Sequence, residues 1–156
     1  MIRLLALDVD GTLTDGAIYL DGKGNELKRF HVQDGMGLAL LRKSGVKVAL
    51  ISGRFSPVTG ERARELNIDI VHNGTEDKLN CLLSICSDLG IVQNEVAYAG
   101  DDINDLECIQ WAGKGFAVAN AVLQIREASD HVCSREGGSG AVREIAEIIM
   151  DLNGRE

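Results

Sequence analysis

The stretch MIRLLALDVDGTLTDG, residues 1–16, joins an apolar run to two carboxylates, Asp8 and Asp10. Further short runs rich in Val, Ile, Leu and Ala recur along the chain, and longer stretches of helical period separate them. Such an alternation is typical of strands that helices cover on both faces. The sequence therefore predicts an α/β fold, a Rossmann-like three-layer sandwich with a mostly parallel central sheet.

The predicted elements alternate along the chain. Strands are expected at Ile2–Val9, Val46–Ser52, Ile68–His72, Val96–Gly100, Gly115–Val118 and His131–Cys133. Helices are expected at Gly35–Lys43, Val58–Leu66, Glu76–Leu89, Asn104–Trp111, Val122–Ala128 and Gly140–Leu152.

One segment breaks the alternation. Residues 17–30, AIYLDGKGNELKRF, hold two short strand-like runs joined by DGKGN, which is a hairpin turn signal. We expect a small β-hairpin insertion here, within a single domain that spans residues 1–156.

The composition limits the functional classes. A chain of 156 residues that is 45% hydrophobic suffices for one core, and its net charge of −8 argues against a nucleic-acid partner. The N-terminal apolar run is too short for a membrane span of about 20 residues, and it lacks a signal-peptide cleavage site. The four cysteines form neither a zinc-ligand pattern nor a CxxC motif, which indicates reduced thiols and a cytoplasmic location.

Polar residues follow four of the predicted strands. Open parallel sheets bind their ligands at the carboxyl ends of the strands, so these residues are expected to face one another across one edge. Asp8 and Asp10 are separated by one residue and would point to the same side of an extended chain. The four polar segments are DVDGTLTDG at 8–16, SGR at 52–54, HNG at 72–74 leading to Lys78, and GDDINDLE at 100–107.

The carboxylates in these segments indicate a metal site. Two unit charges about 4 Å apart repel by about 4 kcal/mol at an effective dielectric constant of about 20. Holding Asp8, Asp10, Asp101 and Asp102 ionised in one crevice therefore requires a cation or a shared proton. Mg²⁺ is the usual oxygen-liganded cation in phosphate chemistry, so we expect it as the cofactor.

Ser52, Lys78 and nearby glycines at the same edge suit a phosphoryl group. Mg²⁺ and Lys78 would neutralise the phosphate oxygens so that Asp8 could attack phosphorus. Asp10 would protonate the leaving oxygen and then activate water. The predicted chemistry is hydrolysis of a phosphomonoester through an aspartyl-phosphate.

With these four motifs in this order, the chain resembles the haloacid dehalogenase superfamily of phosphatases over nearly its whole length. The resemblance implies that Asp8 is the nucleophile and a metal ligand. It also implies that Asp10 is the acid/base residue and binds Mg²⁺ through its backbone carbonyl. Asp101 would complete the protein ligands, and Ser52 and Lys78 would hold the phosphate.

Two further carboxylates have supporting roles in this resemblance. Asp102 would lie close to the metal, and Asp105 would position Lys78 rather than touch the substrate. From the residues alone, Asp101, Asp102 and Asp105 could also be turn formers or helix caps.

Within the superfamily, the chain resembles the 3-deoxy-D-manno-octulosonate 8-phosphate (KDO 8-phosphate) phosphatases. The resemblance rests on the short length, the hairpin, FHVQDGMG at 30–37 and GGSGAVRE at Gly137–Glu144. It implies a small β-hairpin insertion in place of a cap domain and a role in lipopolysaccharide biosynthesis. It also implies a homotetramer whose hairpins associate and whose neighbouring subunits help to close each site. The Gly137–Glu144 segment either approaches a neighbour's site or is only a flexible connection, and the sequence leaves both open.

The residues that would bind the sugar acid match the family pattern less completely than the four motifs do. Gln33 stands where this family often has a basic residue, which removes one candidate contact for the substrate carboxylate. Arg54 fits the KDO 8-phosphate enzymes, whereas phosphatases of nine-carbon sugar acids tend to have an acidic residue there. Arg54 and Arg143 are therefore candidate carboxylate partners, since the guanidinium fork matches that geometry.

Alternative functions remain open at this point. The same chemistry would serve a nine-carbon sugar acid 9-phosphate or another small phosphometabolite. The chain could instead be an anion-binding regulatory or assembly subunit, or an acceptor domain phosphorylated on Asp8, but the intact Asp10 argues against both. Without the order of the motifs, Ser52 could simply cap a helix and Lys78 could lie on a solvated face.

Overall fold

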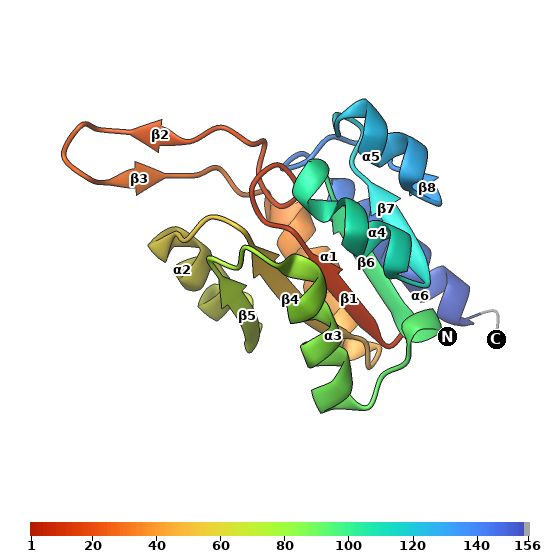
Figure 1. Ribbon diagram of the computed structural model, residues 1–156. Helices are drawn as coiled ribbons and strands as arrows, with labels where there is room; N and C mark the ends of the chain where they lie inside the picture. Colours follow the sequence, from red (N-terminus) through yellow and green to blue (C-terminus); the bar gives the residue numbers. More distant parts are fainter. Residues whose placement is uncertain (155–156) are drawn as a thin grey trace.

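The central sheet has six strands in the order β5-β4-β1-β6-β7-β8 in the computed structural model, which describes residues 1–154 (Figure 1). Every adjacent pair of strands in this sheet is parallel, which confirms the predicted α/β class. The strands are β1 (Leu4–Leu7), β4 (Lys47–Ser52), β5 (Ile70–Asn73), β6 (Val96–Gly100), β7 (Lys114–Ala117) and β8 (His131–Val132).

Strand β1 lies in the middle of the sheet and is buried along its whole length. Its side chains are all apolar because helices cover both of its faces, so neither face meets water. Burying a leucine side chain contributes about 1.5–3 kcal/mol, and Leu4, Leu5 and Leu7 are completely inaccessible. The strand is therefore a fixed base for the carboxylates that follow it.

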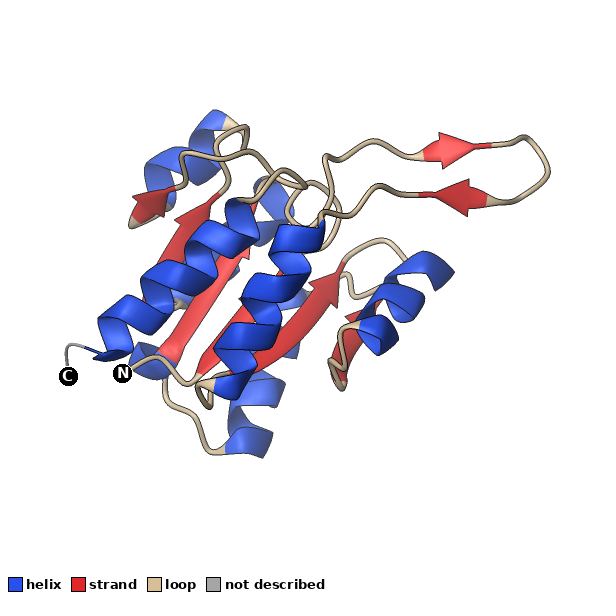
Figure 2. Ribbon diagram, turned by 180° about the vertical axis from the view of Figure 1, so that it is seen from behind, coloured by secondary structure: helices blue, strands red, loops and turns tan. Residues whose placement is uncertain are grey.

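Helices pack on both faces of the sheet. Figure 2 shows α1 and α6 side by side across one face, and α3 and α4 lie on the opposite face in Figure 1. No helix among residues 1–154 is both long and apolar enough to cross a membrane. The α-helices are α1 (Val32–Lys43), α2 (Pro57–Glu65), α3 (Lys78–Leu89), α4 (Leu106–Trp111), α5 (Leu123–Ala128) and α6 (Ala141–Gly154).

Capping side chains explain where the predicted helix boundaries were wrong. Helix α1 begins earlier than predicted, because the His31 side chain accepts a hydrogen bond from a backbone N–H of its first turn. Helix α3 begins at Lys78 because Asp77 is its N-cap and accepts from the Asn80 N–H at 3.0 Å. The segment expected to start a helix at Asn104 is instead a 3₁₀ turn, η2 (Ile103–Asp105), before α4; a second 3₁₀ turn, η1 (Gln93–Glu95), precedes β6.

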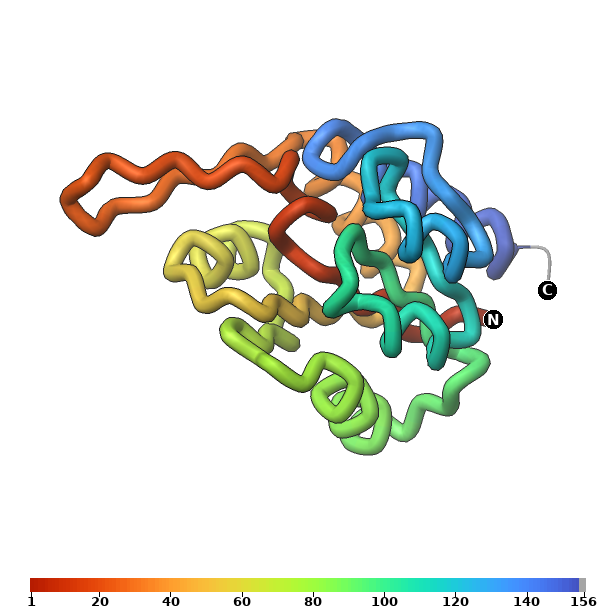
Figure 3. The backbone as a smooth tube through the Cα atoms, turned by 45° about the horizontal axis from the view of Figure 1, so that its top comes forward, coloured from red at the N-terminus to blue at the C-terminus, as the bar shows by residue number. Residues whose placement is uncertain are grey.

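The predicted hairpin is present and projects from the body as an arm (Figure 3). Its strands, β2 (Tyr19–Leu20) and β3 (Glu26–Leu27), are antiparallel and shorter than the sequence pattern indicates. Asp21 fixes the turn, since one of its carboxylate oxygens accepts from the backbone N–H groups of Lys23 and Asn25. Apart from an isolated antiparallel bridge between Thr14 and Phe30 at the base of the arm, only these short stretches pair, because the arm has no sheet or helix of its own to pack against.

The order of the strands places a switch point between β1 and β6. The chain runs outward from β1 through β4 to β5, then returns to β6 and runs outward the other way through β7 to β8. Open α/β sheets bind ligands outside the carboxyl ends of the strands at such a switch point, which here are the ends of β1 and β6. The segments after these two strands begin at Asp8 and Asp101.

Candidate active site

A buried lysine joins two carboxylates at the switch point. The Lys78 ammonium lies 2.6 Å from Asp8 Oδ1 and 2.8 Å from Asp105 Oδ1. All three residues are buried, with exposed fractions of 3% for Lys78, 5% for Asp8 and 0% for Asp105. Helix α3 delivers Lys78 from its first turn, whereas Asp8 follows β1 directly and continues its pairing by donating its N–H to Ala99 O.

Asp105 is held by four donors. Its Oδ1 accepts from Lys78 and from the Tyr98 hydroxyl at 2.8 Å, and its Oδ2 accepts from the N–H groups of Asp101 and Asp102. Its lone pairs are therefore used within the protein, which leaves Asp105 to fix Lys78 and the turn after β6. The structure thus places Asp105 in contact with Lys78, and the positioning role expected from the sequence stays a prediction.

Burial and charge alter the proton affinities in this cluster. Burial, helped by Asp105, raises the pKa of Asp8 against the opposing effect of Lys78. Burial also raises the pKa of Asp101, to about 6. For Lys78 burial alone would lower the pKa, but Asp8 and Asp105 outweigh it and raise the pKa, so the ammonium stays charged.

The cluster has the features of a magnesium site. Oxygen atoms of Asp8, Asp101 and Asp105 lie within 4.8 Å of one another. Gly11, with φ of +90°, brings its backbone so close that a Cβ there would lie 2.0 Å from Asp101 Oδ2. Hard carboxylate oxygens are the donors that Mg²⁺ prefers, and the pKa values of Asp8 and Asp101 are raised first by burial and then by neighbouring carboxylates, so a bound cation would stabilise their ionised forms. Since Asp105 already accepts four hydrogen bonds, Asp8 and Asp101 are the carboxylates that remain to bind a metal.

The end of β4 lies beside Lys78. A Cβ on Gly53 would be 3.6 Å from Lys78 Cε, so the backbone after Ser52 passes close to the lysine stem. Ser52 is 1% exposed, its hydroxyl donates to Arg54 O, and its carbonyl accepts from the N–H groups of Gly74 and Thr75. The segment at 52–54, Lys78 and Asp8 are thus brought together by three different strand ends.

Asp10 and Arg54 contact the hairpin. Lys28 Nζ lies 2.7 Å from Asp10 Oδ1, and Arg54 Nη1 lies 2.7 Å from Glu26 Oε1. The hairpin arm therefore borders the site that the sheet edge forms. Asp102 lies farther out, since it is exposed and accepts from the Ile103 N–H as the cap of η2.

Arg143 lies on α6 and has different surroundings. Its side chain pairs with Glu147, and its backbone N–H donates to buried Asp34. It lines a hollow with Gln33 and Arg135, and none of the contacts described for residues 1–154 joins it to Asp8. Its proposed contact with a substrate carboxylate therefore stays a prediction.

The GGSG segment packs against the site within the same chain. The Gly138 N–H donates to Thr12 O, and a Cβ on Gly137 would lie 1.9 Å from Gly11 O. Only glycine permits this approach, so the segment supports the back of the loop that carries Asp8 and Asp10. Its relation to a neighbouring subunit is not tested by these contacts.

Three contributors were missed by sequence reasoning: Tyr98, Glu26 and Lys28. A tyrosine inside an otherwise apolar buried strand requires a partner for its hydroxyl, which was a usable signal. In the hairpin, Glu26 of β3 and Lys28, just after it, are two residues apart and share one face of the extended chain, opposite the exposed Leu27. The alternation is visible in the sequence, but it does not indicate which face of the hairpin turns toward the sheet.

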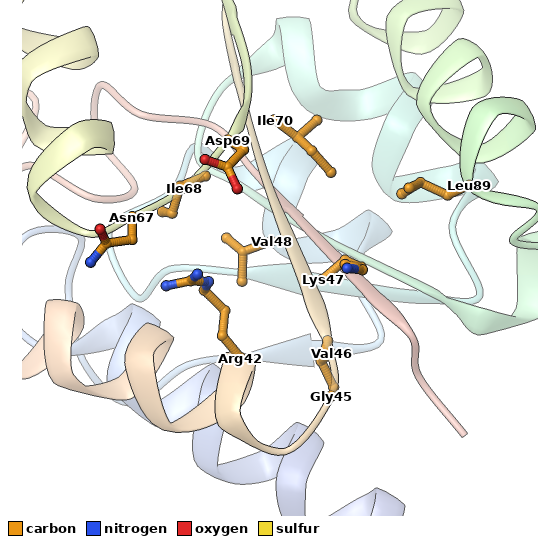
Figure 4. Close-up of a pocket in the computed structure, with 10 residues that line it drawn as sticks. All are labelled: Arg42, Gly45, Val46, Lys47, Val48, Asn67, Ile68, Asp69, Ile70 and Leu89. Atoms are coloured by element: carbon orange, nitrogen blue, oxygen red, sulfur yellow. The ribbon is translucent and has the colours of Figure 1, made fainter.

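A hollow of about 370 Å³ lies at the amino ends of β4 and β5 (Figure 4). Its lining includes Arg42, Val48 and Ile70, and none of the predicted site residues is among the residues that form it. It is at the edge of the sheet opposite the switch point, and we assign it no role in catalysis.

Comparisons with known proteins agree with this geometry. Residues 57–145 match the family model of haloacid dehalogenase-like hydrolases. Over 154 residues the chain is 38% identical to the KDO 8-phosphate phosphatase KdsC of Haemophilus influenzae, covering 99% of this chain and 86% of that protein. It is also 38% identical to KdsC of Escherichia coli K12, covering 99% of this chain and 82% of that protein.

Solved structures give the same result. A crystal structure of KDO 8-phosphate phosphatase from Moraxella catarrhalis, in complex with magnesium, phosphate and KDO, has a TM-score of 0.94 and 45% identity, covering 96% of this chain and 86% of that one. The enzyme from Yersinia pestis has a TM-score of 0.94 and 39% identity, covering 96% and 80%. These similarities and the buried carboxylate–lysine cluster at the switch point confirm the resemblance seen in the motifs: the chain belongs to the haloacid dehalogenase-like hydrolase family.

Proposed function

We propose that this chain is a Mg²⁺-dependent phosphatase that hydrolyses KDO 8-phosphate through an aspartyl-phosphate on Asp8. The observation that carries the proposal is the buried contact of Lys78 with Asp8 at the carboxyl end of β1. The names and bound ligands of the relatives support this substrate. Arg54 also supports it, as a cation beside the site that suits the carboxylate of a sugar acid.

In the first half of the reaction, an Asp8 carboxylate oxygen attacks phosphorus and the bond from phosphorus to the sugar oxygen breaks. Asp10 gives its proton to that leaving oxygen. Lys78 neutralises charge on the phosphoryl oxygens, and Ser52 holds them.

In the second half, water attacks the phosphorus of the aspartyl-phosphate and Asp10 takes its proton. The bond between phosphorus and Asp8 then breaks and releases inorganic phosphate. Asp105 and Tyr98 keep Lys78 in place throughout, because Asp105 contacts both of them.

Asp8, Asp101 and the backbone carbonyl of Asp10 would hold the metal, with Asp102 nearby. When bound, Mg²⁺ supplies positive charge that offsets both the carboxylates and the phosphate.

The assembly we propose is a homotetramer joined through the hairpins. Tyr19, Leu20 and Leu27 support it, since they are 54%, 71% and 69% exposed on the arm of a single chain. Burying these side chains between subunits would also shield the site from water. Sedimentation equilibrium should give about four times the 16.8 kDa mass of the chain, and a monomer mass would contradict this assembly.

The proposed substrate places the enzyme in the cytoplasm, in lipopolysaccharide biosynthesis. The four free cysteines and the net charge of −8 are consistent with a reducing compartment and with a small soluble substrate rather than a nucleic acid or a membrane.

Phosphate release from a panel of substrates tests the function. The panel contains KDO 8-phosphate, a nine-carbon sugar acid 9-phosphate and simple hexose phosphates, each with Mg²⁺. We expect preference for KDO 8-phosphate, loss of release in Asp8→Asn, and normal release in Asp88→Asn, which changes an exposed aspartate on α3.

Each other outcome has a defined meaning. Preference for another member of the panel would move the substrate assignment within the phosphatases. Absence of release that depends on Asp8 from every member would refute the enzyme and favour an anion-binding subunit.

A further inference from the structure

The side chain of Lys28 is buried although the residue belongs to an exposed arm. Its side chain is 0% exposed, whereas its neighbour Leu27 is 69% exposed. A lysine is almost never fully buried unless its charge is paired. Lys28 meets this requirement with two carboxylates, Asp10 Oδ1 at 2.7 Å and Glu26 Oε1 at 3.4 Å.

The contact with Asp10 is an ion pair without hydrogen-bond geometry. Lys28 Nζ and Asp10 Oδ1 are in contact, yet neither atom makes a well-aligned hydrogen bond among the described residues. The lysine therefore holds this oxygen through its positive charge, which attracts the ionised carboxylate and, more weakly, the carbonyl dipole of the protonated acid. Neither form of Asp10 gives up a directional lone pair to the lysine, as a group that donates a proton to the leaving oxygen and takes one from water requires.

Glu26 anchors Lys28 to the sheet. Its Oε1 also accepts from Arg54 Nη1 at 2.7 Å and from the Ser56 hydroxyl at 3.3 Å, both of which follow β4. The hydrogen bond from Arg54 is the main cause of the lowered pKa of Glu26, so this carboxylate is ionised at neutral pH. One anion thus fixes the face of the hairpin from which Lys28 reaches across to Asp10.

The charges form a continuous chain over two edges of the site. It runs from Asp10, after β1, through Lys28 and Glu26 of the hairpin to Arg54, after β4. A purely structural anchor for the hairpin would need only the contact between Glu26 and Arg54. The buried ammonium of Lys28 adds a second attachment. It contacts Asp10, which is the one side chain that the proposed mechanism uses for both proton transfers.

We propose that Lys28 is a positioning residue, which holds the Asp10 carboxyl in place for proton transfer to the leaving oxygen. This role rests on the proposed phosphatase function. It makes the hairpin part of the catalytic apparatus of its own chain.

The test compares two substrates that differ in their need for a general acid. The sugar oxygen of KDO 8-phosphate must be protonated as it leaves, whereas p-nitrophenolate departs without a proton. The ratio kcat/KM reports events up to the first irreversible step, formation of the aspartyl-phosphate, so it isolates this proton transfer.

Lys28→Met should lower kcat/KM for KDO 8-phosphate by about 30-fold or more, as part of the 10²–10⁴ that general acid catalysis contributes. The same variant should lower kcat/KM for p-nitrophenyl phosphate less than about threefold. Lys28→Arg keeps the positive charge but changes its position. It should therefore lower kcat/KM for KDO 8-phosphate by less than Lys28→Met does, and again lower kcat/KM for p-nitrophenyl phosphate much less. Lys23→Met is the matched control, since Lys23 is exposed at the tip of the same hairpin, and it should change neither value.

Equal losses on both substrates, or no loss on either, would overturn the positioning role. If Lys28→Met does not fold, as judged by circular dichroism, Lys28→Arg carries the same comparison. A wild-type chain that releases phosphate from neither substrate would refute the proposed phosphatase and the role of Lys28 with it, whereas equal losses in variants of an active wild type refute only the role of Lys28.

Discussion

Replacing Asp105 with asparagine removes one charge from the centre of the site and changes almost no volume. In the wild-type chain, both carboxylate oxygens of Asp105 only accept hydrogen bonds, two from side chains and two from backbone N–H groups. An amide offers one accepting oxygen, so its NH₂ group must face either Lys78 and Tyr98 or the two backbone donors.

The structure sets the size of the effect. Asp105 is 0% exposed, so water cannot replace the lost acceptor, and Lys78 is left with Asp8 as its remaining carboxylate partner. Removing one partner of a buried ion pair costs about 3–5 kcal/mol. We expect Asp105→Asn to lose about this much unfolding free energy.

Urea unfolding followed by circular dichroism, in buffer with a chelator, measures the loss at constant slope. Asp102→Asn is the control, because Asp102 is exposed in the same loop and an asparagine can still cap η2. A loss for Asp105→Asn within about 0.5 kcal/mol of that of Asp102→Asn would show that the buried network contributes no net stability.

Three other predictions concern the metal site and the packing behind it. Without Mg²⁺, the contribution of Asp101 to the unfolding free energy should be fully present below about pH 4 and be lost as the pH rises through about 6, because burial raises the pKa of Asp101 to about 6; the raised pKa of Asp8 acts in the same direction. The raised pKa of Asp101 alone corresponds to a fall of about 3 kcal/mol in unfolding free energy. Urea titrations at several pH values should show this fall, and the same titrations with saturating Mg²⁺ should show its reversal. Gly11→Ala places a methyl group 2.0 Å from Asp101 Oδ2 and should weaken Mg²⁺ activation of phosphate release at least tenfold. Gly16→Ala is the control, since Gly16 has a similar φ and no such clash, and it should not weaken this activation. Equal effects of the two substitutions would contradict the close-approach argument. Asp34→Ala leaves the half-buried N–H of Arg143 at the start of α6 without its acceptor and should cost about 1–3 kcal/mol in urea unfolding. A larger loss in Asp34→Asn would count against this reason.

The sequence predicted those parts of the site that depend on the direction of the strands. Asp8, Ser52 and Asp101 lie near one another because parallel strands end at the same edge, and apolar runs that stop at polar residues mark those ends. Lys78 was placed correctly relative to them by the order of the motifs. Helix boundaries were less accurate because caps such as Asp77 depend on one hydrogen bond that competes with other turn geometries.

The rest depends on tertiary contacts that no local pattern contains. The hairpin was predicted from DGKGN, but the direction in which it leans, and hence the pairing of Lys28 with Asp10, follows from the anchor between Glu26 and Arg54. Likewise, the identity of Tyr98 did not reveal that its hydroxyl reaches Asp105. Both contacts join segments through side chains, whose partners depend on how the finished sheet is twisted and packed.

The packing of Gly137 and Gly138 against the loop at residues 11–14 determines when the site is completed during synthesis. The ribosome releases the loop that follows Asp8 early and the glycine pair only near the end. The loop therefore lacks the contacts with these glycines through most of translation. Contacts between segments so far apart in the chain also form slowly during refolding, because closing a long loop costs entropy. A nascent chain therefore exposes its cluster of aspartates before it can hydrolyse anything, and activity should appear as one of the last events in its maturation.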